Sequence, residues 1–267
     1  MDVPGDALGY PRALVAVPSA GWSVGRWGRA RPGPARKNGL RRARLSTRLE
    51  NGEVTVTRLF AVSLLVLAVV PFHSSIGPLP GPVRWELRHG AWHPGCPVPL
   101  SDLRVLSVSY RGFDGNTYNG QLVVNRSAAA PLAEVFRQLY ALHFPIRHMS
   151  LADSYGPARA RPADGDLSGS FECRQAVPSP CVGGSGTGTW SEHAFGEAVD
   201  LNPVENPYVG CGQTRDPASR AFFNRSKHRR GMVTAAVVRA FRSIGWGWGG
   251  SWSGSTKDFM HFSASGH

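Results

Sequence analysis

Two short stretches of the chain contain the residue types of a catalytic metal site. The first carries His193 and Asp200, and the second, later in the chain, carries Asp258 and His261. Two imidazoles and one carboxylate can hold a zinc ion and leave an open position for water, while the other carboxylate accepts a proton. We therefore predict His193, Asp200 and His261 as Zn²⁺ ligands and Asp258 as the general base.

The local sequence favours elements that would position these side chains. Gly196 allows a tight turn after His193. The stretch 198–201 is typical of a short buried strand with Asp200 on one face, and 260–262 is typical of a second strand that would bring His261 alongside. Asp258 would then lie just outside that second strand, facing the water on the metal.

Other interpretations of the same residues exist. A single His or Asp is also typical of a surface position or of a hydrogen-bonded residue without a metal. A Ser-His-Asp triad of Ser191, His193 and Asp200 is an alternative chemistry, but no nucleophile-elbow turn surrounds Ser191.

The combined pattern has a family resemblance. It consists of Ser191-x-His193-x-x-Gly196-x-Ala198-x-Asp200, the glycine and tryptophan cluster 245–250, and Asp258-x-x-His261. Over residues 103–262 the chain resembles the zinc D-alanyl-D-alanine carboxypeptidases, which include the vancomycin-resistance D,D-peptidases and the L-alanyl-D-glutamate endopeptidases of phage endolysins. The resemblance implies peptidoglycan stem peptides as substrates.

The resemblance also implies two substrate-binding residues. The segment Phe171-x-Cys173-Arg174 is similar to one whose arginine meets the substrate, and Ser191 matches a substrate-contacting serine. A guanidinium group suits a peptide carboxylate or carbonyl because it forms paired hydrogen bonds. Members that act as dipeptidases usually have Glu where this chain has Asp258. The bond that is cut therefore stays open between terminal D-Ala–D-Ala, L-Ala–D-Glu and a cross-bridge.

The basic charge of the protein is concentrated at its N-terminus. Residues 1–58 contain 11 Lys and Arg against 4 Asp and Glu, within a total net charge of +12. We expect this leader to be disordered. It is an arm for nucleic acid or anionic lipid, an extended basic n-region, or upstream sequence from a mis-assigned start. We favour the last, because a start near Val54 or Val56 would leave an ordinary export signal.

An apolar run and a linker follow the leader. The uncharged run 59–70, inside the segment 59–72, would span about 18 Å as a helix, short of a hydrocarbon core of about 30 Å. It is typical of a signal-peptide h-region, with an uncleaved membrane anchor as the alternative. We therefore expect an exported, extracellular or cell-wall protein. Residues 73–100 are rich in Pro and Gly and are predicted as a linker.

All four cysteines lie after the apolar run, so disulfides are expected. Three pairings are possible and the sequence does not choose between them. We favour Cys96–Cys173 with Cys181–Cys211. A cysteine-ligated zinc is the competing interpretation, but the sequence has no C-x-x-C spacing.

The remaining residues, 101–267, are predicted to form one α+β peptidase domain. Alternation at Leu106, Val108 and Tyr110 and a return at 121–124 indicate a β-hairpin. Apolar periodicity predicts a helix from Ser127 to about His143 and a second over 232–244, closed by Gly245. We expect a small antiparallel sheet bearing the zinc site, packed by these two helices.

Two functions of other classes remain open. One is a cell-wall binding module that keeps zinc without catalysis, against which the presence of Asp258 speaks. The other is a nucleic-acid-binding protein, suggested by a pI near 10.4. Because the charge lies mainly before the export signal, we expect no nucleic-acid partner, and we expect a monomer.

Overall fold

A computed structural model describes residues 70–156 and 162–267. The basic leader and nearly all of the apolar run lie outside these residues. No helix within the described ranges is long and apolar enough to cross a membrane. The described elements are helices and three small antiparallel sheets, so the chain has the α+β fold expected from its sequence.

The first sheet has the order β1-β2-β3, from β1 (Ser74–Pro78), β2 (Leu103–Arg111) and β3 (Thr117–Asn125). The turn between β2 and β3 uses Gly115 at a φ of 86° and Asp114, whose carboxylate accepts from the Asn116 N–H. This is the hairpin predicted from the alternation of apolar residues. Successive residues of a strand point to opposite faces, and in β2 and β3 both faces carry buried apolar residues, which belong to two separate clusters.

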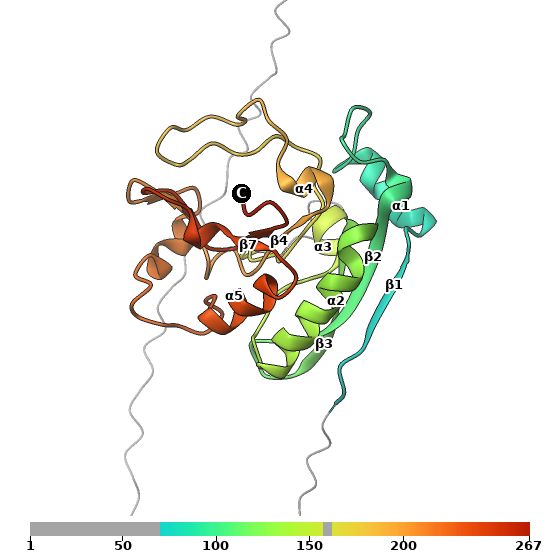
Figure 1. Cartoon of the computed structure of the whole chain (residues 1–267), viewed down its shortest axis with the longest axis horizontal. Coiled ribbons are helices and arrows are strands. Elements are labelled where there is room, and N and C mark those ends of the chain that lie inside the picture. Colours follow the sequence, from blue (N-terminus) through green and yellow to red (C-terminus); the bar gives the residue numbers. More distant parts are fainter. Residues whose placement is uncertain (1–69, 157–161) are drawn as a thin grey trace, which may run out of the picture. The chain divides into compact units, whose positions relative to one another are not determined.

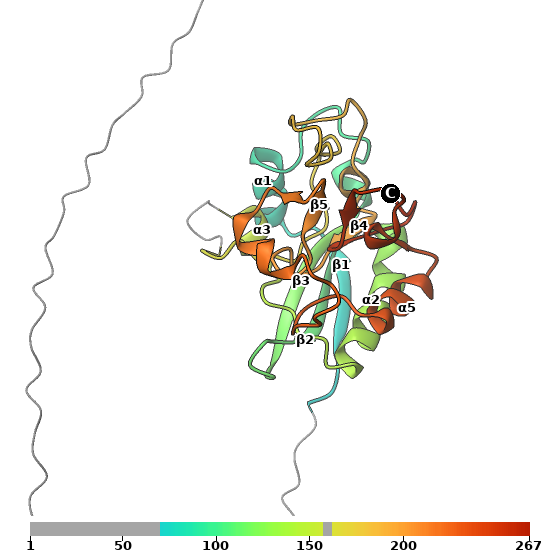
Figure 2. The same ribbon diagram turned by 90° about the vertical axis from the view of Figure 1, so that its left-hand side faces the viewer.

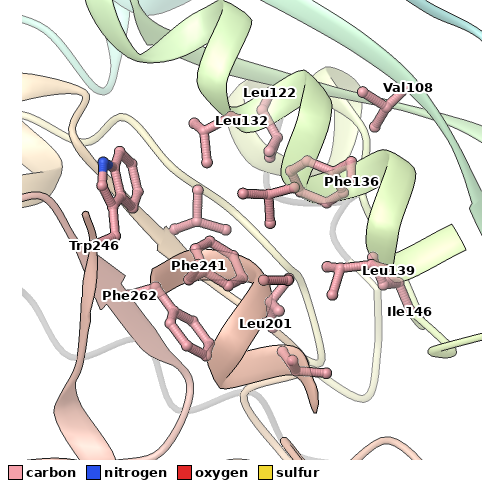
Figure 3. Close-up of a cluster of buried hydrophobic side chains, with 14 of the residues drawn as sticks. Val108, Leu122, Leu132, Phe136, Leu139, Ile146, Leu201, Phe241, Trp246 and Phe262 are labelled. Atoms are coloured by element: carbon pink, nitrogen blue, oxygen red, sulfur yellow. The ribbon is translucent and has the colours of Figure 1, made fainter. Parts of the chain in front are cut away.

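One face of this sheet packs on α2 (Arg126–Ala141), as Figures 1 and 2 show. Leu106 and Leu122 pair across the strands and meet Leu132 and Phe136 of the helix. Figure 3 shows this cluster continuing to α5 (Ala235–Arg242), through residues such as Phe241. The two predicted helices are therefore present. The first helix was predicted to start at Ser127. Its N-cap is instead Asn125, whose side chain accepts the Ser127 N–H.

The other face covers a second apolar cluster. Leu103, Val105 and Val123 contact residues of the segment before β2 and of the later segment around Phe171. The earlier segment contains α1 (Gly81–His89) and the 3-10 helix η1 (Leu100–Asp102). Residues 73–100, predicted as a linker, thus include β1 and α1 and bury apolar side chains: Leu79, Leu87, Val98 and Leu100. They belong to the folded unit.

The second sheet has the order β4-β9-β7, from β4 (Ala198–Asp200), β9 (His261–Ser263) and β7 (Gly247–Trp248). Its apolar face joins the main core, where the rings of Phe262 and Phe241 stack with centroids 3.9 Å apart. The strands expected at 198–201 and 260–262 are therefore observed, shifted by one residue in the second case.

The third sheet has the order β6-β5-β8, from β6 (Gln213–Thr214), β5 (Tyr208–Gly210) and β8 (Lys257–Asp258). The sequence led us to expect one sheet, and strands of two or three residues are too short to carry a periodic signal. The remaining elements are α3 (Leu151–Tyr155), α4 (Glu192–Phe195), and the 3-10 helices η3 (Pro217–Phe222) and η4 (Gly249–Ser251).

Candidate metal centre

Asp200 and His261 face each other across two strands of the second sheet. They are direct partners in the antiparallel register of β4 and β9, so their side chains leave the same face of the sheet. Val199 and Phe262, their neighbours, point to the opposite face and are fully buried in the core. The apolar residues thus fix the register that brings the carboxylate and the imidazole together.

His193 reaches this site from α4, a single helical turn. Ser191 is its N-cap, and Gly196 ends it at a φ of 67°. A Cβ at Gly196 would lie 2.7 Å from the backbone N of Asn125, so only glycine fits there. The Asn125 N–H also donates to the Gly196 carbonyl at 2.8 Å. The tight turn expected after His193 is therefore present, and it fastens α4 to the first sheet.

The side chains of His193, Asp200 and His261 form a triangle of close contacts. Nε2 of His193 lies 3.2 Å from Nδ1 of His261 and 3.2 Å from Oδ2 of Asp200, and Nδ1 of His261 lies 3.2 Å from Oδ1 of Asp200. Ligand atoms bound at about 2.0–2.1 Å to a tetrahedral zinc ion lie about 3.3 Å apart. The donor set and its spacing therefore fit a tetrahedral ion with a fourth position free for water or substrate.

Backbone carbonyls set the tautomers of both imidazoles. Nδ1 of His193 lies 2.5 Å from the carbonyl of Ser170, and Nε2 of His261 lies 3.2 Å from that of His267. A carbonyl only accepts, so each of these ring nitrogens carries the proton. The lone pairs of the other two nitrogens then face the triangle, which is the arrangement typical of metal-binding histidines.

His193 and Asp200 also perturb each other's protonation. Burial alone would lower the pKa of His193 and raise the pKa of Asp200, but their mutual attraction outweighs it. The pKa of His193 is therefore raised, and the pKa of Asp200 is held well below its ordinary value. A pocket that stabilises a carboxylate beside a protonated imidazole is suited to bind a metal ion, which would take the place of the added proton.

Asp258 lies beside this triangle but belongs to another sheet. It is in β8, opposite Tyr208 of β5. A Cβ at Gly249 would lie 2.8 Å from the Asp258 Cβ, so Gly249 leaves room for this close approach. Burial, followed by repulsion from Asp200, raises the pKa of Asp258 to about 7. Within residues 70–156 and 162–267, Asp258 Oδ1 is buried without a hydrogen-bond partner. An unpaired oxygen with a pKa near neutrality is suited to exchange a proton.

The two residues expected to bind substrate have different surroundings. Arg174 borders the centre, and its Nε donates to Glu172 at 2.6 Å. Ser191 is buried, and its Oγ accepts the backbone N–H of His193 at 3.4 Å. No hydrogen bond of the described residues joins that hydroxyl to an imidazole, and Nδ1 of His193 is bonded to Ser170 instead. The geometry is therefore not that of a Ser-His-Asp triad.

Two cavities meet at the triangle of His193, Asp200 and His261. One, of about 760 Å³, extends toward α1 and α3 and is called the α1 cavity; it is lined by Trp85, Glu86, His89, Tyr155 and Glu172, among others. The other, of about 410 Å³, is called the tryptophan cavity; it is lined by Trp190, Ser191, Tyr208, Trp252 and Asp258, among others. Arg174, His193 and Asp200 line both. All six predicted site residues thus border one cleft.

The tryptophans in and just after the glycine-rich cluster 245–250 divide between core and cleft. Trp246 is buried in the main core, whereas Trp252 lines the tryptophan cavity. Two residues of the site were missed, Ser170 and Gly249. Ser170 contributes a backbone carbonyl, for which the sequence carries no signal.

Two disulfides connect walls of the cleft. Cys96 is joined to Cys173, and Cys181 is joined to Cys211, which is the favoured pairing. The first joins the segment after α1 to the segment that carries Arg174. The second joins the loop before Trp190 to the turn between β5 and β6. The four sulfurs are engaged with one another, so a cysteine-ligated zinc is wrong for this form of the protein.

Comparison with known proteins identifies the part of the chain that carries the site. Residues 185–264 match a family described as D-alanyl-D-alanine carboxypeptidase. The match includes the triangle and Asp258 and supports the resemblance found in the sequence. It does not include α1, β2, β3 or Arg174. No curated protein and no solved structure matches the chain.

Proposed function

We propose that this chain is a zinc-dependent peptidase that hydrolyses the stem peptides of peptidoglycan outside the cytoplasmic membrane. The observation that carries the proposal is the triangle of His193, Asp200 and His261, with edges of 3.2 Å, beside an unpaired oxygen of Asp258. The family match over residues 185–264 supports the peptidase chemistry and the peptidoglycan substrate.

His193, Asp200 and His261 would hold the ion through Nε2, a carboxylate oxygen and Nδ1. When bound, zinc supplies a Lewis acid that activates a water molecule and polarises the scissile carbonyl. The carbonyls of Ser170 and His267 keep both imidazoles in the tautomer that binding needs.

Asp258 would move the proton of the reaction. Its Oδ1 takes a proton from the attacking water, whose oxygen forms the new bond to the carbonyl carbon. The same carboxyl then gives that proton to the leaving nitrogen as the peptide C–N bond breaks. The products are a carboxylic acid and an amine, and Asp258 returns to its starting state. A pKa near 7 suits both halves of this exchange.

Arg174 and Ser191 would position the peptide. Arg174 lines both cavities, so its remaining N–H groups are within reach of a substrate carbonyl or carboxylate next to the scissile bond. The description of the matched family favours the D-alanyl-D-alanine bond. An internal bond of the stem is the alternative. A zinc-containing binding module without catalysis is the alternative of another class, and the presence of Asp258 argues against it.

Export follows from the same proposal. Two disulfides are typical of a protein that matures in an oxidising compartment. The apolar run at 59–70 would act as the export signal or anchor, and a monomer would suffice because the described site draws all its residues from one chain.

The test is digestion of purified peptidoglycan peptides by the zinc-loaded protein, with products identified by mass spectrometry. Hydrolysis that stops on chelation and resumes with zinc supports the proposal. A protein that binds zinc at the triangle and releases no product from any stem peptide contradicts it.

A further inference from the structure

The metal centre lies at the junction of two cavities rather than at the closed end of one. The α1 cavity and the tryptophan cavity have volumes of about 760 and 410 Å³. Both lie in the range of about 300–1,000 Å³ that is typical of ligand-binding pockets. An enzyme that removes one terminal alanine needs such space on one side of the scissile bond only. The cleft of this chain has room for peptide on both sides.

The α1 cavity contains an exposed aromatic surface. Trp85 is 57% exposed, and its ring stacks on His89 with centroids 4.0 Å apart. His89 Nδ1 also bonds to the Trp85 carbonyl at 2.7 Å, which holds the two rings together. An exposed tryptophan held at the edge of a cavity provides a large apolar contact area for a ligand at little entropic cost.

The same cavity contains a carboxylate that has no ion-pair partner among the described residues. Glu86 lies next to Trp85 and forms no ion pair within the described part of the chain. Of the other two acidic residues of the cavity, Glu172 is paired with Arg174 at 2.6 Å, and Asp200 belongs to the triangle. A free carboxylate beside an aromatic ring is complementary to an ammonium group on an apolar chain.

The wall that carries Trp85 and Glu86 is fastened to the metal centre. Leu87, the next residue of α1, is fully buried. Cys96, after α1, is bonded to Cys173, whose N–H also donates to the Ala91 carbonyl at 2.9 Å. Residue 174, which follows, borders the metal centre. The distance from α1 to the scissile bond is therefore fixed by the fold. None of this wall lies in the residues matched by the family.

We propose that the enzyme cuts inside a peptide, and that the α1 cavity binds the part of the peptide that carries a free side-chain amine. Trp85 covers the apolar portion of that residue, and Glu86 pairs with its ammonium group. The chemical step is the same hydrolysis, so no additional reactant is needed. This inference rests on the proposed function and selects among its substrates.

The experiment compares two forms of one substrate. The first is a five-residue stem peptide ending in D-Ala–D-Ala whose third residue has a free side-chain amine, and the second is the same peptide with that amine acetylated. Zinc-loaded wild type is expected to cut the first at an internal bond, as seen by mass spectrometry. Acetylation is expected to lower kcat/KM about tenfold, the effect of losing one charge-assisted hydrogen bond.

Variants connect this preference to the cavity. Glu86→Gln is expected to lower kcat/KM about tenfold for the free amine, and acetylation should then have no further effect. Trp85→Ala should lower kcat/KM for both substrates. The matched control is Glu134→Gln on α2, whose carboxylate is paired with Arg137 outside both cavities and should leave kcat/KM unchanged. Zinc content and thermal unfolding verify that each variant folds.

Two results separate the proposals. If the wild type releases only the terminal alanine, or if Glu86→Gln retains the preference for the free amine, the present inference is overturned and the peptidase proposal stands. If the zinc-bound protein hydrolyses neither substrate nor any other stem peptide, both are overturned.

Discussion

Nδ1 of His193 donates to the backbone carbonyl of Ser170, across a separation of 23 residues in the chain. This bond fixes the proton on one side of the ring, so Nε2 presents its lone pair to Asp200 and His261. Ser170 is itself held, because its Oγ donates to the Ala198 carbonyl at 2.7 Å. The orientation of one proposed metal ligand therefore depends on the strand that carries another proposed ligand, Asp200.

The first prediction concerns metal content. The folded protein is expected to bind one zinc ion, and His261→Ala is expected to lose it, because two ligands and a water hold the ion much more weakly than three. Elemental analysis after dialysis against trace zinc is the measurement. Leu142→Ala, at an exposed residue after α2, serves as the control. Two zinc ions per chain, or iron retained in preference to zinc, would contradict the assignment.

The second prediction separates Asp258 from the ligands. Asp258→Asn keeps the shape of the side chain but cannot accept the proton, so the rate of peptide hydrolysis should fall by about 10²–10⁴-fold. Zinc content should remain that of the wild type, since the triangle is intact. Both quantities are measured on the same sample. A zinc-free Asp258→Asn protein would make Asp258 a ligand, and full activity would mean that the base lies elsewhere.

The third prediction concerns stability and pH. Asp166, with 1% of its side chain exposed, shares Arg147 with Glu205. Burial, then the neighbouring Glu205, raises the pKa of Asp166 to about 7 from 3.8. The folded state therefore holds a proton that the unfolded state has lost. The contribution of Asp166 to the free energy of unfolding is full below about pH 4 and is lost as the pH rises to about 7.

Urea unfolding of the metal-free protein across this pH range is the measurement. Asp166→Asn should show a smaller decrease of stability with rising pH than the wild type, because its side chain does not titrate. The two proteins would instead have parallel pH profiles if Asp166 stayed ionised in the folded state throughout.

The fourth prediction concerns the disulfide beside the α1 cavity. Cys96 and Cys173 are separated by 77 residues. Replacing both with Ala should lower the free energy of unfolding by about 2–5 kcal/mol, because the unfolded chain regains the freedom that the cross-link removes. Urea unfolding under oxidising conditions measures this. The wild type should show no free thiol on denaturation, and four reactive thiols would contradict the pairing.

The sequence predicted those elements that are long enough to show a repeating pattern of apolar residues. The hairpin of β2 and β3 has nine residues in each strand, and α2 has 16 residues, so alternation and helical spacing could both be read. The start of α2 could not be predicted, because Asn125 and Ser127 are both good capping residues. Helix α1 was missed although Pro82 lies in its first turn, a position where proline is common.

The site was predictable to the extent that its chemistry lies in side chains. His193, Asp200, His261 and Asp258 form a pattern that the sequence displays, and the structure brings them together. The carbonyl of Ser170 and the cavity under Trp85 depend on how distant segments pack. A single sequence holds no signal for a backbone acceptor, and the exposed tryptophan gave no indication of the cavity.

Asp258 belongs to a different sheet from Asp200 and His261. Asp200 and His261 lie in the sheet β4-β9-β7, Asp258 lies in the sheet β6-β5-β8, and only Phe259 and Met260 connect them along the chain. If the chain has the function that we propose, a substitution in the β5–β6 hairpin would shift the proton acceptor while the metal stays in place. Turnover and metal affinity would then be separable traits, so directed evolution toward other peptide bonds could vary the hairpin without losing the ion.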